Sequence, residues 1–480
     1  MARRLVLMLL VAVCAGLPGP AVAGAVEPPP ELRVTAGERS ATAFQVGYCR
    51  PAGDGMFGCV TASLVAGFQF PALAAKPQSR VVVDTRLAAS AVEVTLSPPD
   101  GGNEETVEES VAVSRIDDRH WAFAMGSTTA RASLRVEYTD GGSSDSLLTL
   151  RRIVAESPGS GSLAAYGDLV AWSERAGDGY HLTALVDGRT SRLPVAPRSV
   201  PFDVDLGPSA EGRPVAVYSR CEAEATPEGP GLTHPHTSGR GCDLYRYDFD
   251  TARESKVAGA STTEASEVLP SIWRDRIAFA RVYEQRSGAR GRVAYLYVRR
   301  LEGGRSERQP GGARGTDGLP GPTSVDLYGR RLSFAWSYAT GDQAGVTELR
   351  LDTLGGGHRV LSSARYPGLG GNGTSASFLS PQGVGGRILY AYQRVRLDGE
   401  AVAVPEPGGG HTDAVGFTTD SVAALALRYR IATRDKDART LPGRTAGLAA
   451  GPDGLFLAQR DDLLARERGT TTIVDARDLR

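Results

Sequence analysis

The sequence predicts an all-β protein with two parts, a β-sandwich of immunoglobulin-like type followed by a β-propeller, for three reasons. The 59 glycines and 29 prolines among 480 residues indicate many turns between short segments. Up to about residue 152, apolar and polar residues alternate in short runs, as in strands with one buried face. Beyond residue 162, a turn followed by a strongly apolar run recurs along the chain, as in a repeat fold.

The first element, residues 1–23, is predicted to be a secretory signal peptide. Arg3 and Arg4 precede an apolar run from Leu5 to Leu17, and Ala21-Val-Ala23 is a small-residue cleavage site. The apolar run is shorter than the roughly 20 residues that span a bilayer. We expect an exported mature chain without a membrane span, located in the periplasm, outside the cell or at the cell wall. The paired arginines leave general and twin-arginine export open.

Residues 32–152 are predicted to form the β-sandwich. Turn clusters such as PPDGGN and DGGSSD separate about nine short strands, which suits an immunoglobulin-like arrangement. The clearest strands are ELRVTA, TAFQVGYC, RVVVDT, AVEVTLS, VAVSRI, HWAFAM and ASLRVEYT. The Cys…Trp…Cys spacing of true immunoglobulin domains is missing, so the sequence predicts the architecture and no family.

The four cysteines that remain after signal cleavage are predicted to form two local disulfides, Cys49 with Cys59 and Cys221 with Cys242. Four cysteines allow three pairings, but each of these pairs brackets its own loop, and export implies an oxidising compartment. The alternative is a zinc site in which His234 and His236 assist Cys221 and Cys242. The short Cys spacing that is usual for zinc is absent.

Residues 153–162 are predicted to be a Gly/Ser-rich linker, and residues 163–480 the propeller. About seven related units carry a Gly/Asp turn and then an apolar strand that is buried on both faces: YGDLVAWSER, EGRPVAVYSR, RDRIAFARVY, YGRRLSFAWS, GGRILYAYQR, TDSVAALALR and GPDGLFLAQRD. Several are followed by a hairpin and preceded by another short strand, which is the anatomy of a four-stranded blade. Seven blades are expected, with six as the alternative.

These units resemble a known group. GPDG followed by LFLA, with the hairpin LYRYDFDTARE, is similar to the TolB-like, WD40-like (PD40-type) propeller repeats of bacterial envelope proteins, over roughly residues 160–480. The resemblance implies a rigid exported propeller that often works by binding proteins. The group's partner, a peptidoglycan-associated lipoprotein, is not carried over, because a β-sandwich stands here in place of the α/β domain.

No catalytic, cofactor-binding or metal residue is predicted. The sequence has no nucleophile elbow, no zinc-peptidase motif and no phosphate-binding loop. Asp203 and Asp205 could point toward a central channel, either as calcium ligands or as ordinary hydrogen-bonding groups. The other histidines are expected to be structural in strands (His120, His181) or exposed in loops (His358, His411).

The expected function follows from charge and loop length. With 54 basic and 55 acidic residues and no basic run, nothing favours nucleic acid as a partner. The predicted loops 220–243, 283–291 and 337–345 are long and would emerge on one face of the propeller, where loops on a rigid scaffold commonly carry recognition. We expect a non-enzymatic scaffold that binds an envelope or extracellular protein. The alternatives are a secreted hydrolase acting on carbohydrate or peptide, and a cell-wall adhesin whose sandwich binds polymer.

Overall fold

The computed structural model describes residues 27–476 apart from short internal segments. Those segments are 52–56, 63–69, 100–107, 159–162, 168, 224–239, 285–291, 310–313, 316–320, 340–344, 367–378, 385–386, 393, 398–399, 402–411, 418–421, 427–429, 434–435, 441–443, 451–454 and 461–469. The predicted signal peptide lies outside the described residues. Every regular element within them is a β-strand, which confirms the all-β prediction.

Residues up to 158 form two sheets. The first has the order β2 (Arg39–Thr42), β1 (Arg33–Ala36), β6 (Arg80–Asp84), β10 (His120–Ala124) and β9 (Ser114–Arg115). The second has the order β12 (Ser143–Pro158), β11 (Ala130–Tyr138), β7 (Ala89–Ser97) and β8 (Glu109–Val111). Three more strands join the second sheet, namely β3 (Phe44–Pro51) and β5 (Ala72–Ala75), which pair with β12, and β4 (Phe57–Thr61), which pairs with β3.

These two sheets share one buried apolar cluster. Val83 and Phe123 of the first sheet and Leu134 and Leu148 of the second belong to it. Along β11, buried and more exposed residues alternate, because successive side chains of a strand point to opposite faces. Each sheet therefore buries one face against the other, and all seven strand runs predicted for this region contain observed strands.

β12 connects the two parts of the molecule. Its first half pairs with β11 and β3, and its second half, Ile153–Pro158, pairs with β40 (Thr470–Asp475). The prediction of a linker over 153–162 is therefore wrong for residues 153–158. Ile153 and Val154 are buried apolar residues that continue the strand. The remainder of the predicted linker, 159–162, lies outside the described residues.

From Leu163 to Thr440, each sheet is built on four antiparallel strands taken in chain order. The first two sheets are β13 (Leu163–Tyr166), β14 (Leu169–Ala176), β15 (Gly179–Val186), β16 (Arg189–Arg192), and β17 (Asp205–Pro208), β18 (Pro214–Ala223), β19 (Arg240–Asp248), β20 (Arg253–Lys256). Next come β21 (Ala265–Trp273), β22 (Arg276–Glu284), β23 (Arg292–Arg300), β24 (Gly303–Arg308), with β25 (Arg314–Gly315) beside β23, and β26 (Gly321–Tyr328), β27 (Arg331–Ala339), β28 (Gly345–Thr353), β29 (His358–Tyr366).

The later sheets are built in the same way, and β12 completes the final one. They are β30 (Leu379–Val384), β31 (Arg387–Tyr392), β32 (Arg394–Leu397), β33 (Glu400–Ala401), and β34 (Thr412–Phe417), β35 (Val422–Ala426), β36 (Arg430–Thr433), β37 (Lys436–Thr440). The final sheet is β38 (Arg444–Ala450), β39 (Leu455–Arg460), β40 and β12. The predicted repeat units are the second strands of these sheets, β14, β18, β22, β27, β31, β35 and β39.

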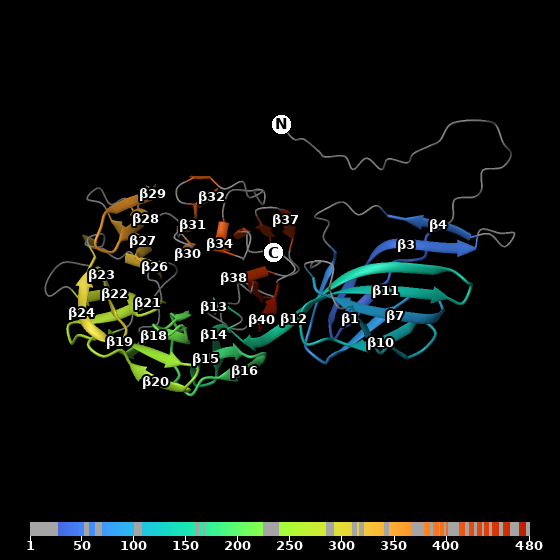
Figure 1. Ribbon diagram of the computed structural model, residues 1–480, viewed down its shortest axis with the longest axis horizontal. Coiled ribbons are helices and arrows are strands. Elements are labelled where there is room, and N and C mark those ends of the chain that lie inside the picture. The colour runs from blue at the N-terminus through green and yellow to red at the C-terminus, as the bar shows by residue number, and fades with distance from the viewer. Residues whose placement is uncertain are drawn as a thin grey trace.

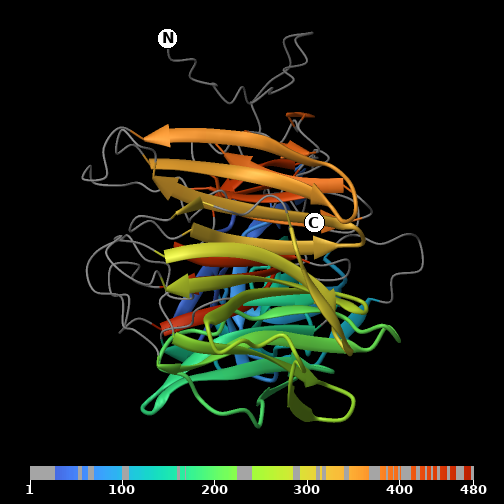
Figure 2. The same ribbon diagram turned by 90° about the vertical axis from the view of Figure 1, so that its left-hand side faces the viewer.

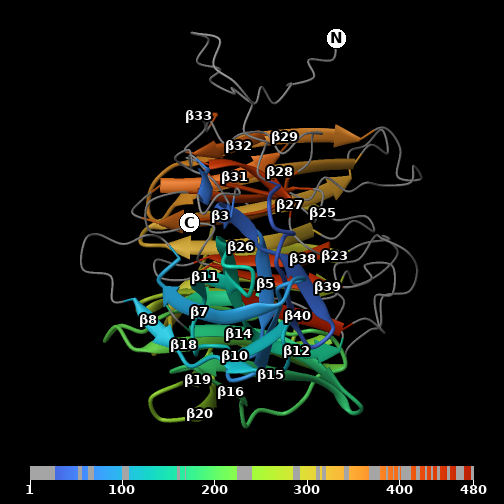
Figure 3. The same cartoon turned by 90° about the vertical axis from the view of Figure 1, so that its right-hand side faces the viewer.

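The first strands of these sheets form a closed ring. Each contacts the first strand of the next sheet, in the order β13, β17, β21, β26, β30, β34 and β38, and β38 contacts β13. Sheets arranged around a ring of inner strands make a β-propeller. In Figure 1 they succeed one another around the left-hand part of the molecule, and β12 runs from there into the N-terminal sheets. Figure 2 shows the sheets layered one over the next, and Figure 3 shows the N-terminal sheets from their side.

Neighbouring propeller sheets pack through apolar faces, and one position recurs in this packing. The second strand of a sheet is buried on both faces at its centre, as predicted, and Leu169 to Ser173 of β14 are all buried. One residue of the second strand packs toward the preceding sheet at an equivalent position in four successive sheets. These residues are Trp172, Tyr218, Arg281 and Trp336. Arg281 is the exception among them, because it places a charge where the others place an aromatic ring.

Candidate functional site

The predicted binding loops connect the second and third strands of three consecutive sheets. Because the strands are antiparallel, these connections emerge on one face of the ring, together with the segments that lead from each sheet to the next. We call this the loop face. The loops themselves, 224–239, 285–291 and 340–344, lie outside the described residues. The described part of the candidate site is therefore its base, between the sheets β17–β20 and β21–β24.

A disulfide closes the base of the longest loop. Cys221 of β18 and Cys242 of β19 are directly opposite residues of the ladder, and their sulfur atoms are 2.04 Å apart. The other predicted pair, Cys49 and Cys59, likewise joins opposite residues of β3 and β4, at 2.08 Å. Both cysteine pairs are thus at disulfide distance, and the zinc alternative for Cys221 and Cys242 is wrong because their sulfurs are bonded to each other. His234 and His236 lie outside the described residues.

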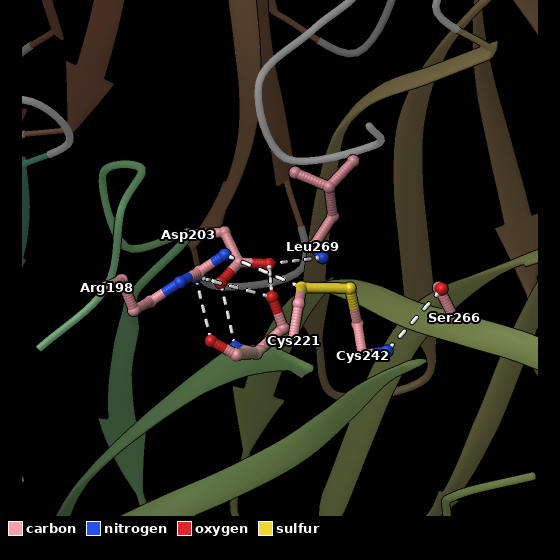
Figure 4. Close-up of a disulfide and its surroundings, with 7 residues drawn as sticks. Arg198, Asp203, Cys221, Cys242, Ser266 and Leu269 are labelled. Carbon is pink, nitrogen blue, oxygen red and sulfur yellow. Dashed lines mark hydrogen bonds and ion pairs between the residues drawn. A yellow bond between two sulfur atoms is a disulfide. The ribbon is translucent and has the colours of Figure 1, made fainter. Parts of the chain in front are cut away.

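Asp203 is the centre of a buried hydrogen-bond cluster beside this disulfide (Figure 4). Its carboxylate accepts bonds from the Ser219 backbone N–H and hydroxyl, at 2.8 and 2.7 Å, and from the Leu269 N–H, at 2.8 Å. Arg198 pairs with it at 3.2 Å, and the Arg198 Nη2 atom is 3.8 Å from the Cys221 sulfur. The cluster therefore ties the segment before β17 to β18 and β21, with every carboxylate oxygen of Asp203 bonded.

Asp205 makes a second connection between the same sheets. Its Oδ2 atom accepts bonds from the Ser271 hydroxyl and the Ile272 N–H, both at 2.9 Å. Burial raises the pKa of Asp205 to about 6, although these hydrogen bonds lower it. Asp203 and Asp205 thus have separate sets of protein donors. This arrangement agrees with ordinary hydrogen bonding, the alternative to a calcium site for these two residues. No group of three His, Cys, Asp or Glu residues that could hold a metal ion occurs in the described part of the chain.

Glu254 of β20 is also bonded within the protein. Its carboxylate accepts bonds from the Tyr218 hydroxyl at 2.8 Å and from Arg220 Nη1 at 2.8 and 3.0 Å. The Arg220 guanidinium also lies over the ring of Tyr245, 4.7 Å from its centre. Burial, followed by the negative charge of Glu254, raises the pKa of Tyr218.

Glu267 differs from these acids because one of its oxygens is unbonded. Its side chain is fully buried, and its Oε1 atom accepts bonds from Arg281 Nε at 2.9 Å and from the Thr262 hydroxyl at 3.2 Å. Its Oε2 atom has no hydrogen-bond partner among the described residues. Burial raises the pKa of Glu267 to about 7, and the nearby Arg281 lowers it only in part. The sequence signals the pair of Glu267 and Arg281 in one way only. An acid interrupts the apolar run ASEVLPS, and an arginine interrupts the apolar run RIAFARV.

The described histidines each pair with a neighbouring aspartate. His120 contacts Asp117 and His181 contacts Asp178, at 2.9 and 2.8 Å. His358 is exposed, as predicted, but it begins β29 instead of lying in a loop, and its Nδ1 atom is 2.6 Å from Asp352. A polar turn sequence before a strand is a poor guide to the strand's first residue. His411 lies outside the described residues.

The fold defines the class: this is an all-β protein built around a β-propeller. No known protein family and no curated protein matches its sequence. Among solved structures it is similar to TolB from Acinetobacter baumannii, with 11% identity and a TM-score of 0.30. The match covers 72% of this chain and 65% of TolB, so the chain spans less than two thirds of that protein.

Two other solved structures illustrate how varied similar proteins are. The β-propeller domain of the Trilobed protease from Pyrococcus furiosus is 11% identical, with a TM-score of 0.37, and the match covers 74% of this chain and 97% of that domain. The α-L-arabinanase of Penicillium chrysogenum, complexed with arabinobiose, is 10% identical, with a TM-score of 0.34 and coverage of 69% and 99%. The propeller assignment rests on the closed ring of inner strands, not on these similarities.

Proposed function

We propose that this chain is an exported, non-enzymatic scaffold that binds another protein of the cell envelope or its exterior through the loop face. In this proposal residues 1–23 are a cleaved signal peptide, the N-terminal sheets are an immunoglobulin-like sandwich and the propeller is TolB-like with seven blades. Two cysteine pairs at disulfide distance support export, because disulfides persist in oxidising compartments. No helix in the described part of the chain is long and apolar enough to cross a membrane.

The observation that carries the proposal is how the base of the loop face is built. Asp203, Asp205 and Glu254 are bonded to arginine, tyrosine, serine and backbone donors, so these acids act as fixed cross-links. The Cys221–Cys242 bond joins β18 and β19 at the base of the longest predicted loop, so it fixes where that loop begins and ends. A rigid base with long connections suits recognition.

Deletion of residues 227–238 tests this proposal. The mature chain, residues 24–480, is crosslinked in its native envelope fraction and the attached protein is identified by mass spectrometry. We expect one reproducible partner, and at least a tenfold loss of binding when 227–238 are deleted. A deletion of residues 102–107, outside the propeller, is the matched control. Unchanged partner binding in a folded 227–238 deletion would rule out this face.

A propeller hydrolase acting on carbohydrate or peptide is the second candidate. The raised pKa of Glu267 does not favour it, because that side chain is fully buried and out of reach of either substrate class. Screening both substrate classes with the mature chain separates the two candidates.

A further inference from the structure

The second N-terminal sheet ends in a strand, β4, whose free edge is exposed. β4 pairs with β3 and with no other strand of the described chain. Figure 1 shows it at the upper margin of the N-terminal sheets, beyond β3. Four of its five residues are exposed, and the remaining one, Gly58, is half-buried. The backbone of this edge is therefore accessible to another strand.

β4 lacks the charged side chains by which exposed edges normally resist pairing with another chain. Its sequence is FGCVT. Apart from the first strands, which line the ring, other edge strands of the described sheets each contain at least one charged residue, namely β2, β8, β9, β16, β20, β24, β25, β29, β33 and β37. β5 is uncharged too, but its residues are buried or half-buried. β4 is thus the uncharged exposed edge of the described chain.

β4 also exposes apolar side chains. Phe57 and Val60 are 59% and 48% exposed, and they are two of the four large apolar side chains that are exposed in the described residues. Successive side chains of a strand point to opposite faces, so Phe57 and Val60 lie on opposite faces of this edge. The Cys49–Cys59 disulfide joins β4 to β3 and so holds the edge in place.

The ladder between β3 and β4 shows which backbone groups face outward. The Ala62 N–H donates to the Val46 carbonyl oxygen at 2.7 Å, so these opposite residues are a hydrogen-bonded pair. Bonded and non-bonded pairs alternate along an antiparallel ladder, so Val60 and Gly58 also bond to β3. The odd-numbered residues of β4 therefore turn their N–H and C=O groups away from β3. They are Phe57, Cys59 and Thr61.

We propose that β4 pairs with β4 of a second copy of this chain, antiparallel across a two-fold axis at Cys59. In this register Cys59 lies opposite the partner's Cys59, and Phe57 lies opposite the partner's Thr61. All five residues of the strand are then paired. The outward N–H and C=O groups of Phe57, Cys59 and Thr61 are bonded in both copies. The second sheet thereby continues from one subunit into the other.

In that register the strand is complementary to itself. The large Phe57 side chain meets the partner's Thr61 on one face, and Val60 meets the partner's Gly58 on the other face. Because β4 has no charge, no like charges face each other across the two-fold axis. A copy of the same strand is therefore the occupant that this edge fits. The pairing involves the N-terminal sheets, so it does not rest on a partner at the loop face.

Sedimentation velocity of the mature chain, residues 24–480, tests the proposal. We expect a monomer at about 1 µM and a discrete dimer toward about 100 µM, because one strand pair buries less area than stable interfaces do. Thr61→Pro should weaken the dimer about tenfold or more, since it removes an outward N–H and leaves the bonds to β3 in place. Ile116→Lys changes another exposed apolar residue and should dimerise like the wild type. A wild type that stays monomeric at about 100 µM would overturn the proposal.

Amide hydrogen exchange locates the interface without the need for a variant. Between dilute and concentrated samples, the N–H groups of Phe57, Cys59 and Thr61 should gain protection. Those of Gly58 and Val60 already bond to β3 and should change little. Protection at a different surface would show that the copies associate elsewhere, against the proposal. A segment of another protein crosslinked to β4, with the mature chain itself monomeric, would assign the edge to that protein instead.

Discussion

At the residue scale, Glu267 links the stability of the propeller to pH. Burial raises its pKa to about 7 in the folded chain, against 4.5 as its ordinary value. The folded chain therefore holds a proton that the unfolded chain releases at lower pH. The stabilising effect is complete below about pH 4.5 and is lost as the pH rises through 7. The charged groups that face Glu267 are Arg281 and, at longer range, Lys256.

Glu267→Gln should remove this dependence. The neutral amide keeps the shape of the protonated acid, so the variant should match the wild type near pH 5. At pH 8 it should be more stable than the wild type by on the order of 3 kcal/mol, because one pKa unit corresponds to about 1.4 kcal/mol. Urea unfolding at both pH values measures the difference. Parallel pH profiles for the two proteins would contradict the assignment.

Asp203→Ala should be among the most damaging single changes on the loop face. It leaves Arg198 buried without its carboxylate and frees the donors of Ser219 and Leu269. Breaking a buried pair from one side costs about 3–5 kcal/mol. Glu302→Ala removes an exposed partner of Arg246 and should cost about 1 kcal/mol or less. Denaturant unfolding of both variants checks the contrast, and equal losses would show that the Asp203 cluster is not a cross-link.

At the scale of single elements, removing the disulfide between β18 and β19 tests how much this bond contributes to the stability of their sheet. The Cys221→Ser/Cys242→Ser double variant opens a loop of sequence separation 21 and should lower the free energy of unfolding by about 3 kcal/mol. The Cys49→Ser/Cys59→Ser variant opens a shorter loop at the exposed strand β4 and is the comparison. Calorimetry should show a clearly lower Tm for the Cys221→Ser/Cys242→Ser variant than for the wild type. An unchanged Tm would mean that the β18–β19 ladder alone fixes the base of the loop.

How much could be predicted from sequence also depends on the element. The second strands of the sheets were predictable, because each apolar run and its turn are contiguous. The disulfides were predictable because each pair is local. The second half of β12 was not, since its partner β40 lies far along the chain and residues 156–162 resemble a linker. Asp203 could be predicted as a hydrogen-bonding group, but its donors could not be named, because they come from three separate segments.

At the scale of the whole molecule, the N-terminal sheets and the propeller share a strand and a polar contact. Glu156 of β12 pairs with Arg39 and Lys76, at 2.7 and 2.5 Å, and Arg39 also donates to Thr472 of β40. Burial raises the pKa of Glu156, but these two cations outweigh it and lower the pKa overall. The two parts therefore cannot be separated at residue 152 without opening the final sheet.

A chain of residues 159–480 should accordingly fail to give a stable monomer, because the edge of β40 has lost its partner and is free to pair with other chains. Residues 151–158 can be moved behind residue 480 through a short Gly-rich linker, where they can form an antiparallel hairpin with β40. This relocation should restore a monomer with cooperative unfolding, as measured by size-exclusion chromatography and circular dichroism. A well-behaved 159–480 monomer would show that β12 is dispensable for closure.

The shared strand also sets an order of events during biosynthesis. β12 is made before any of the first strands of the ring, yet the second half of it cannot pair until β40 has been made. The Thr129 hydroxyl and the Asp475 carbonyl oxygen, which bond beside this junction, are 346 residues apart. Every sheet between them can form from contiguous chain, but the ring stays open until β40 arrives. A chain that ends before Thr470 would thus keep two unpaired strand edges, even if every other sheet had formed. The ring therefore closes only in chains whose synthesis has reached β40.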